Sequence, residues 1–423
     1  MSDIRRSILW VIFAFSLVLL WDAWQVHNGR PKTFFPAPQD QPAASAPATG
    51  TQPVAALPGA APAVVDAATA PAVPRQTYVV STDLLKLSFD SEGGSLIGAD
   101  LLKHLSTGQS TPVRLLLQND QHTYVAQTGL LGSSALPNHK VAMRLVGQAR
   151  DLAEGQDSLS LRFESAPVGG VVLAKTYTLK RGAYDIAVKH EVINQGAAPV
   201  SPQLYLQLVR DGREAGSDVP FASTFTGPAV YSDAAKFQKI AFEDIDKNKA
   251  DFSKSANDGY VAMVQHHFAS AWLLDAGVAR ENYAEKVPGG TLYRAGQKIE
   301  LGAIAPGQSK AVEARLFVGP QEEKVLEQLA PGLELVKDYG WTTIVAKPLY
   351  WLLEKIHAFV GNWGWAIVLL VVVIKAAFYW LNANAYRSMA KMKAVNPRIQ
   401  EMRERLKDKP QQMQQEMMRI YRE

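Results

Sequence analysis

The sequence predicts a mixed membrane protein in which a large all-β domain lies between two membrane-spanning segments and is followed by cytoplasmic α-helices. Two apolar runs, residues 7–24 and 363–381, have the length that a helix needs to cross a hydrocarbon core of about 30 Å. Between them, apolar and polar residues alternate with the period of two that is typical of half-buried strands. After the second run, apolar residues recur at three- and four-residue steps, which indicates helices.

Composition excludes several classes of function. The 423-residue chain has a formal net charge of +4, too small an excess to predict direct, sequence-specific binding of nucleic acid. It contains no cysteine, so a disulfide framework, a thiolate nucleophile and a cysteine metal site are all excluded.

The first apolar run is expected to be an uncleaved signal anchor. Residues 1–6 form a basic cytoplasmic N-terminus with Arg5 and Arg6, and residues 7–24 form the transmembrane anchor. A cleaved signal peptide is the alternative. However, Trp21 and Trp24 stand where small residues should precede a cleavage site.

Positive charges also orient the second span, residues 361–381. Arg387, Lys391 and Lys393 follow it and hold that end in the cytoplasm. Because both ends are then inside, the chain between the spans lies outside the cytoplasm. We therefore expect a multi-pass protein of the bacterial inner membrane with its N-terminus in the cytoplasm and its large domain in the periplasm.

Two periplasmic segments differ sharply in composition. Residues 25–75 are rich in Ala and Pro and have too few large apolar residues to pack, so they are expected to form an extended linker. Residues 76–320 alternate instead, and glycine turns separate the runs, which predicts a large antiparallel β-sandwich. Residues that share one predicted face are Ile186, Val188, His190 and Val192, and in another run Leu204, Leu206 and Leu208.

Helical patterns lead from this domain to the second span. Residues 321–346 are expected to form a helical connector that Pro331 interrupts. Residues 347–360 have apolar side chains at helical spacing but too many charges to cross a bilayer. They form either an amphipathic helix at the outer membrane surface or a helix packed on the domain, and their place beside the span favours the surface.

The second span carries a single charge, Lys375. A charged side chain near the centre of a bilayer costs about 2.5–3.5 kcal/mol on insertion scales. Either its long stem carries the ammonium to the cytoplasmic headgroups, or it faces a wet cavity lined by protein. The polar residues Tyr379, Asn382 and Tyr386 follow on the same side and favour the hydrated recess.

Residues 382–423 predict a basic, methionine-rich cytoplasmic hairpin. They hold ten Lys or Arg against five Asp or Glu, and the helical pattern is expected to break at Asn396-Pro397 and at Pro410. Six of the nine methionines lie in this segment. Either they pack the hairpin, or they offer a soft apolar surface that accepts varied partners.

Catalytic patterns are absent from the sequence. It has no nucleophile elbow, no phosphate loop and no zinc-protease motif. His266 and His267 would point to opposite faces of a strand and so fail to share a metal. Asp244, Asp246 and Asp251 suggest a solvated loop. The sequence therefore predicts no enzyme, no cofactor and no metal site.

Several motifs resemble the YidC family of bacterial membrane-protein insertases. They are Asp-Tyr-Gly-Trp at 338–341, the stretch 356–364 with Gly-Asn-Trp-Gly, Ser-Met-Ala-Lys-Met at 388–392, and residues 402–406 with 415–418. The order of anchor, linker, periplasmic domain, interfacial helix, span and hairpin is also similar. The resemblance implies that the periplasmic domain is a supersandwich related to sugar mutarotases.

The resemblance also implies a function and its residues. The chain would insert and fold inner-membrane proteins, alone or with the Sec translocon, through a hydrophilic groove in the membrane. Lys375 matches the arginine typical of that groove. Implied partners are nascent inner-membrane proteins, the Sec translocon with its accessory subunits, the ribosome and the phospholipid bilayer. Residues expected near clients or the ribosome are Tyr379, Tyr386, Met389, Met392, Met402, Met413 and Met417.

Two departures from the family pattern matter. Lysine keeps the charge of the groove but loses the bidentate geometry of arginine. The chain also stops at Glu423, where the family continues with three more spans, so a fragment is expected. Two other functions stay open from the sequence: an anchored, mutarotase-like domain that binds carbohydrate, and a structural partner of the Sec translocon.

Overall fold

The structure is a computed structural model that describes residues 75–106, 110–132, 135–148, 150–213, 225–337, 343–405, 412 and 418. The expected cytoplasmic N-terminus, signal anchor and linker up to residue 74 lie outside the described residues.

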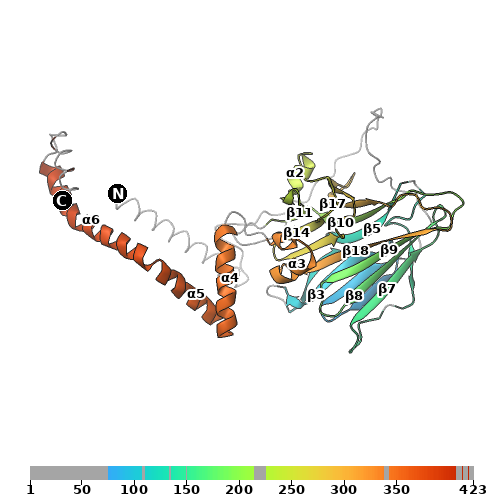
Figure 1. The fold of residues 1–423 in the computed structure, drawn as a ribbon, viewed down its shortest axis with the longest axis horizontal. Coiled ribbons are helices and arrows are strands. Elements are labelled where there is room, and N and C mark those ends of the chain that lie inside the picture. Colours follow the sequence, from blue (N-terminus) through green and yellow to red (C-terminus); the bar gives the residue numbers. More distant parts are fainter. Residues whose placement is uncertain are drawn as a thin grey trace, which may run out of the picture. The chain divides into compact units, whose positions relative to one another are not determined.

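The largest part of the described chain is a sandwich of two nine-stranded antiparallel sheets packed face to face (Figure 1). The first sheet has the order β1 (Thr77–Ser81), β2 (Leu85–Asp90), β3 (Ser95–Leu105), β4 (Pro112–Gln118), β5 (Thr123–Leu131), β10 (Gln203–Asp211), β17 (Leu292–Glu300), β16 (Arg280–Lys286) and β13 (Ser255–Ala256). The second has the order β12 (Lys236–Lys239), β11 (Gly227–Ser232), β14 (Tyr260–Gln265), β15 (Phe268–Leu273), β18 (Ser309–Pro320), β9 (Asp185–Asn194), β8 (Val171–Lys180), β7 (Ser158–Ser165) and β6 (Met143–Val146). The predicted antiparallel β-sandwich is confirmed.

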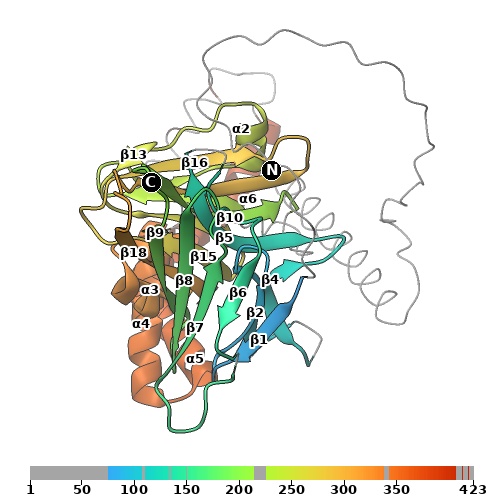
Figure 2. The ribbon, with the colours of Figure 1, turned by 90° about the vertical axis from the view of Figure 1, so that its right-hand side faces the viewer.

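The period-two pattern explains how the sheets share a core. In β9, Ile186, Val188 and His190 are buried between the sheets, whereas Lys189 between them points outward and is exposed. Figure 2 shows the long strands β9, β8 and β7 side by side. Trp272 of β15 crosses the interface, and its indole N–H donates to Gln207 O at 3.1 Å. The predicted inward face of β9 is confirmed.

Helices follow the last strand. They are α3 (Glu323–Leu329), the 3₁₀ helix η1 (Leu333–Val336), α4 (Thr343–Val360), α5 (Trp363–Ala377) and α6 (Tyr379–Arg405), and a short α2 (Phe242–Asp246) precedes β13. The predicted interruption at Pro331 is confirmed, because α3 ends before it and η1 begins after it. Helix α4 begins four residues before the predicted start of the interfacial helix and contains Pro348.

The break predicted at Asn396-Pro397 is wrong, because α6 continues through Pro397 to Arg405. Proline removes one backbone donor, here the one that would bond to the carbonyl four residues earlier. Well over four helical turns precede it, and adding residues to an existing helix is favourable, so the loss of one bond does not end the helix.

Candidate functional site

The sandwich encloses a charged group, the ammonium of Lys175 on β8. Its Nζ donates to Gly93 O at 2.5 Å and to Thr128 O at 2.7 Å, and the residue is fully buried. Burial lowers the pKa of Lys175 to about 7. Backbone carbonyls hold the side chain in place and no solvent reaches it, so this lysine is a structural element of the core.

His190 on β9 lies beside this lysine. Its Nε2 is 3.0 Å from the hydroxyl of Thr128, and the ring is fully buried. Burial, together with the positive charge of Lys175, lowers the pKa of His190 to about 3. The burial of both residues could be inferred from the sequence, since each occupies an inward position in a strand whose inward and outward residues alternate. Neither residue is accessible to a substrate.

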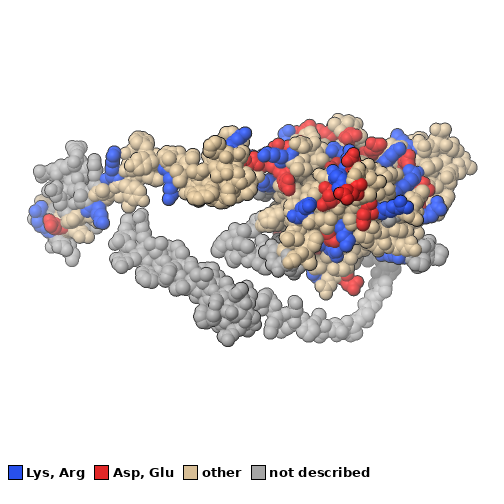
Figure 3. Space-filling view, turned by 90° about the horizontal axis from the view of Figure 1, so that it is seen from below, with Lys and Arg blue, Asp and Glu red and all other residues tan. Residues whose placement is uncertain are grey.

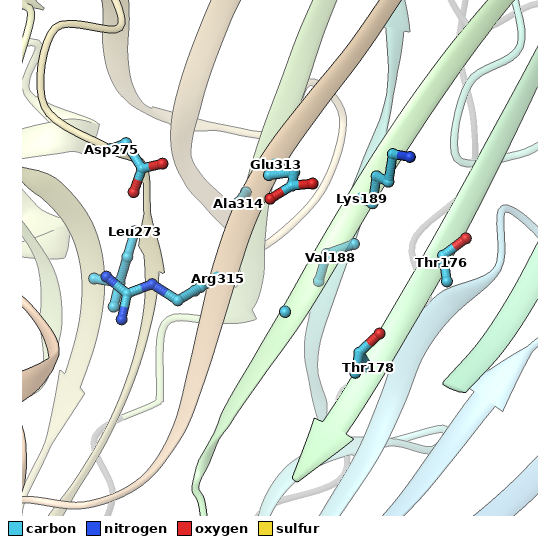
Figure 4. A pocket seen from close by; sticks show the side chains of 10 residues that line it. Thr176, Thr178, Val188, Lys189, Leu273, Asp275, Glu313, Ala314 and Arg315 are labelled. Atoms are coloured by element: carbon cyan, nitrogen blue, oxygen red, sulfur yellow. The ribbon is translucent and has the colours of Figure 1, made fainter. Parts of the chain in front are cut away.

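A hollow of about 340 Å³ lies on the outer face of the second sheet (Figure 4). Thr176, Lys189 and Glu313 form one row across β8, β9 and β18. Arg315 and Asp275 line its other side, so charges of both signs face an open surface. The hollow holds no buried nucleophile beside a base, and it does not point to catalysis.

The prediction of a solvated loop at Asp244 and Asp246 is wrong. Asp244 and Asp246 lie on the short helix α2 rather than in a loop. Asp246 accepts hydrogen bonds from Lys286 Nζ and from Tyr293 OH, both at 2.8 Å, so it ties α2 to β16 and β17.

His266 and His267 lie in the turn between β14 and β15, not on a strand. Their rings are 3.8 Å apart, so the expectation that they point to opposite faces is wrong, because a turn does not impose strand alternation. Burial and the neighbouring ring lower the pKa of His267. Among the described residues, no group of three or more His, Asp or Glu is arranged to hold a metal ion.

Helix α5 presents apolar side chains that nothing in the described chain covers. Val368 and Val372 are 50% and 56% exposed, and Phe378, which caps the helix, is 54% exposed. In Figure 3 this part of the molecule is largely tan, whereas charges of both signs cover the sandwich. An apolar surface of this kind, around a whole helix, is typical of a segment that lipid or a partner covers.

A helix needs about 20 mainly apolar residues to cross a bilayer. No single described helix is both long and apolar enough to cross a bilayer. Helix α5 and residues Tyr379–Ala390 of α6 meet that requirement together, by length and composition alone, with a bend of 56° between them. The bend lies at Phe378, whose backbone leaves the helical region at φ −90° and ψ 2°. The sequence predicted one span across residues 361–381 and offered no signal for this division.

Lys375 lies in the last turn of α5 and is exposed. No hydrogen bond or ion pair joins its ammonium to another described residue. Its position three residues before the bend also suits a helix end, where a cation faces free backbone carbonyls. It is the single charged residue on α5.

The predicted client-proximal residues on α6 separate into different faces. Tyr379 and Tyr386 are 72% and 71% exposed and are seven residues apart, which places them within about 20° of each other on an ideal helix. Met389 is exposed about a quarter turn away and Met392 nearly opposite. Met402 differs, because it is only 4% exposed. Met413 and Met417 lie outside the described residues.

Comparison with known proteins identifies the family. A family model described as the YidC periplasmic domain matches residues 77–352, and one described as 60Kd inner membrane protein matches residues 355–423. The chain is 51% identical to a membrane protein insertase YidC of Burkholderia ambifaria over 99% of its own length and 76% of that protein. The chain belongs to the YidC family of membrane protein insertases.

A relative from Paraburkholderia phytofirmans, also named membrane protein insertase YidC, is 49% identical, with the same coverage of 99% and 76%. This YidC-family chain is therefore an inner-membrane protein with a periplasmic domain, and its family acts on inner-membrane proteins.

Solved structures resemble the sandwich only distantly. A galactose mutarotase related enzyme from Lactobacillus acidophilus has a TM-score of 0.38 and 8% identity, covering 57% of this chain and 97% of that one. A putative aldose 1-epimerase from Escherichia coli K12 has a TM-score of 0.34 and 14% identity, covering 58% of this chain and 99% of that one.

Proposed function

We propose that this YidC-family insertase receives polar parts of its clients at Lys375, in a hydrated groove in the cytoplasmic half of the membrane. One observation carries the proposal: α5 is apolar, largely uncovered, and holds Lys375 as its single charge. Lys375 lies twelve residues after Trp363, about 18 Å along the helix axis. If Trp363 marks the outer edge of the hydrocarbon core, this distance reaches past its midpoint.

The physical role of such a cation is to reduce the cost of moving a client's polar residues into the membrane. Unpaired polar and charged groups are expensive in hydrocarbon, and a fixed ammonium with water lowers that cost. The client's apolar helix then moves into lipid because its burial there is favourable. No nucleotide hydrolysis is required, and we propose that the chain is not an enzyme.

We propose a topology and partners to match. Both ends of the chain lie in the cytoplasm and the sandwich lies in the periplasm. The exposed face of α6 that carries Tyr379 and Tyr386, continued by Met389, contacts nascent chains leaving the ribosome. Clients also arrive through the Sec translocon and its accessory subunits. Met392 lies on another exposed face of α6, outside this surface, whereas Met402 is buried.

The two other functions are less favoured. Relatives that share about half of their residues with this chain over 99% of its length are named insertases. A carbohydrate-binding domain and a purely structural Sec partner have no comparable support.

Substitution of Lys375 tests the proposal. Lys375→Leu should reduce insertion of a client with an acidic translocated tail by about tenfold, since an interaction of about 1–2 kcal/mol in the membrane is lost. Lys375→Arg keeps the charge and should insert normally. A client with an uncharged tail is the matched control. Normal insertion of the acidic client by Lys375→Leu, at normal protein levels, would show that the lysine only reaches for the headgroups.

A further inference from the structure

The junction between α4 and α5 is short and closely defined. Gly361 has φ 71°, the left-handed conformation that ends helices, and its amide donates to His357 O at 2.7 Å. Asn362 follows at once as the N-cap of α5, and its side-chain oxygen accepts from Trp365 N at 3.1 Å. Two residues therefore end one helix and begin the next. Figure 1 shows the change of direction of the chain here.

An aromatic pair bridges this junction. The rings of His357, in the last turn of α4, and Trp363, the first residue of α5, are stacked with centroids 3.7 Å apart and planes 11° apart. A two-residue connection between helices has few allowed conformations. The stack restrains the rotation that remains, because both rings must stay in register for the contact to exist.

The exposed fractions of the side chains at this junction show that the stack does not pack a protein core. Trp363 is 49% exposed and neighbouring Phe359 is 91% exposed, so the pair is not part of a protein core. Within α5, Ala366 is the buried residue. A contact that buries little area adds little to stability, but across a two-residue junction it controls the angle between the helices.

We propose that His357 and Trp363 form a clasp that positions the amphipathic helix α4 at a fixed angle to α5, and that insertion requires this angle. His357 acts here as a positioning residue through Trp363. The clasp does not depend on whether Lys375 receives polar groups of a client, since it concerns the geometry of the two helices.

The chain's lack of cysteine allows a direct measurement of this angle. Spin labels on Val345→Cys in α4 and Val372→Cys in α5, both exposed positions, report the distance between the helices in the full chain in lipid nanodiscs. We expect one narrow distance distribution. His357→Leu, which has no ring to stack, should broaden it and reduce client insertion by about threefold or more. His357→Phe, which keeps a ring, should restore both.

Glycine variants give an independent test. Gly361→Ala leaves both rings present but strains the left-handed backbone, so it should shift the distance and reduce insertion. Gly289→Ala is the matched control: Gly289 has φ 74° with open space around it, in the exposed turn between β16 and β17, and should change neither measurement. The proposal is overturned by a narrow, unshifted distribution in His357→Leu, by normal insertion despite a broad one, or by failure of His357→Phe to rescue both.

Discussion

Two lysines of this chain occupy opposite environments. Lys175 is fully enclosed between the sheets and donates to two backbone carbonyls. Lys375 is exposed on an apolar helix and has no partner among the described residues. The fold alone explains Lys175, because its ammonium donates its hydrogen bonds within the sandwich. Lys375 has no hydrogen-bond or ion-pair partner among the described residues, and for this reason we propose a functional role for it.

The buried lysine makes the stability of the sandwich depend on pH. The pKa of Lys175 is about 7 in the folded chain, below its ordinary value of 10.5. Between these values the unfolded chain binds the extra proton, so the free energy of unfolding should rise with pH from about 7 to 9.5, by at most about 1.4 kcal/mol per pH unit. Lys175→Met should remove this slope. Thermal unfolding of the detergent-solubilised chain at several pH values measures it.

A control substitution at an exposed lysine, and the ionisation of two other buried residues, set the conditions of that experiment. Lys86→Met on the exposed face of β2 should keep the slope. Below about pH 6.5 the low pKa of His190 adds a second loss of stability, because unfolding then lets this ring take up a proton. Above about pH 10 the raised pKa of Tyr124 opposes the lysine, since the unfolded tyrosine ionises first. An equal slope in Lys175→Met and the parent chain would contradict the assignment.

At the scale of elements, a glycine links the sandwich to the helices. Gly332 starts η1 with φ 74°, and its carbonyl accepts from Tyr260 OH at 2.7 Å. A Cβ placed there would overlap the Tyr231 ring, which stacks on Tyr260. Gly332→Ala should therefore lower the free energy of unfolding by about 1–3 kcal/mol from overpacking, in addition to the backbone strain.

Gly307 separates the two effects. It has φ 75°, and a Cβ added there would meet no atom within 4 Å, so Gly307→Ala should show only the backbone strain of about 1–2 kcal/mol. Urea unfolding of both variants measures the difference between them. Equal losses would mean that the Tyr231 ring moves aside freely and that the junction is not closely packed.

Helix α6 allows a second test at this scale. Photo-crosslinkers at Tyr379 and Tyr386, which share a face, should capture a ribosome-bound nascent client. A crosslinker at Ser388, exposed but about half a turn from that face, should capture several-fold less. Equal capture at all three positions would show that α6 has no preferred client face.

The sequence predicted elements best where one period covers the whole segment. The strands around Ile186 and Leu204 follow from alternation, although β10 is buried on both faces, since Tyr205 and Gln207 are buried as well as Leu204. The bend at Phe378 could not be predicted, since neither proline nor glycine stands there. The helix through Pro397 was missed for the opposite reason: a breaker is present, but the helix around it is long enough to tolerate it.

The candidate site was predictable only in part. Lys375 stands out in the sequence as one charge in an apolar run, and the structure leaves it exposed on α5. The clasp of His357 and Trp363 was not predictable, because stacking across a junction depends on the turn at Gly361 rather than on a repeating pattern. The burial of Met402 was not predictable either, because helical spacing alone does not show which face of a helix is covered.

At the scale of the whole molecule, a charged sandwich and an uncovered apolar helix in one chain require two different solvents. The sandwich carries exposed charges of both signs, and α5 carries exposed valines. Water suits the first and lipid the second. The basic residues after α5, among them Arg387 and Lys393, predict that α6 lies on the cytoplasmic side of the membrane.

This topology can be measured with single cysteines, because the parent chain has none and gives no background. Ser158→Cys, at an exposed position of β7, should react with a membrane-impermeant maleimide in intact spheroplasts. Ser388→Cys on α6 and Ser2→Cys at the N-terminus should react only after lysis, because positive charges hold both regions in the cytoplasm. All three should react equally in denatured samples. Labelling of Ser388→Cys from outside would place α6 in the periplasm, and the groove, the ribosome contact and the orientation of Lys375 would then all be wrong together.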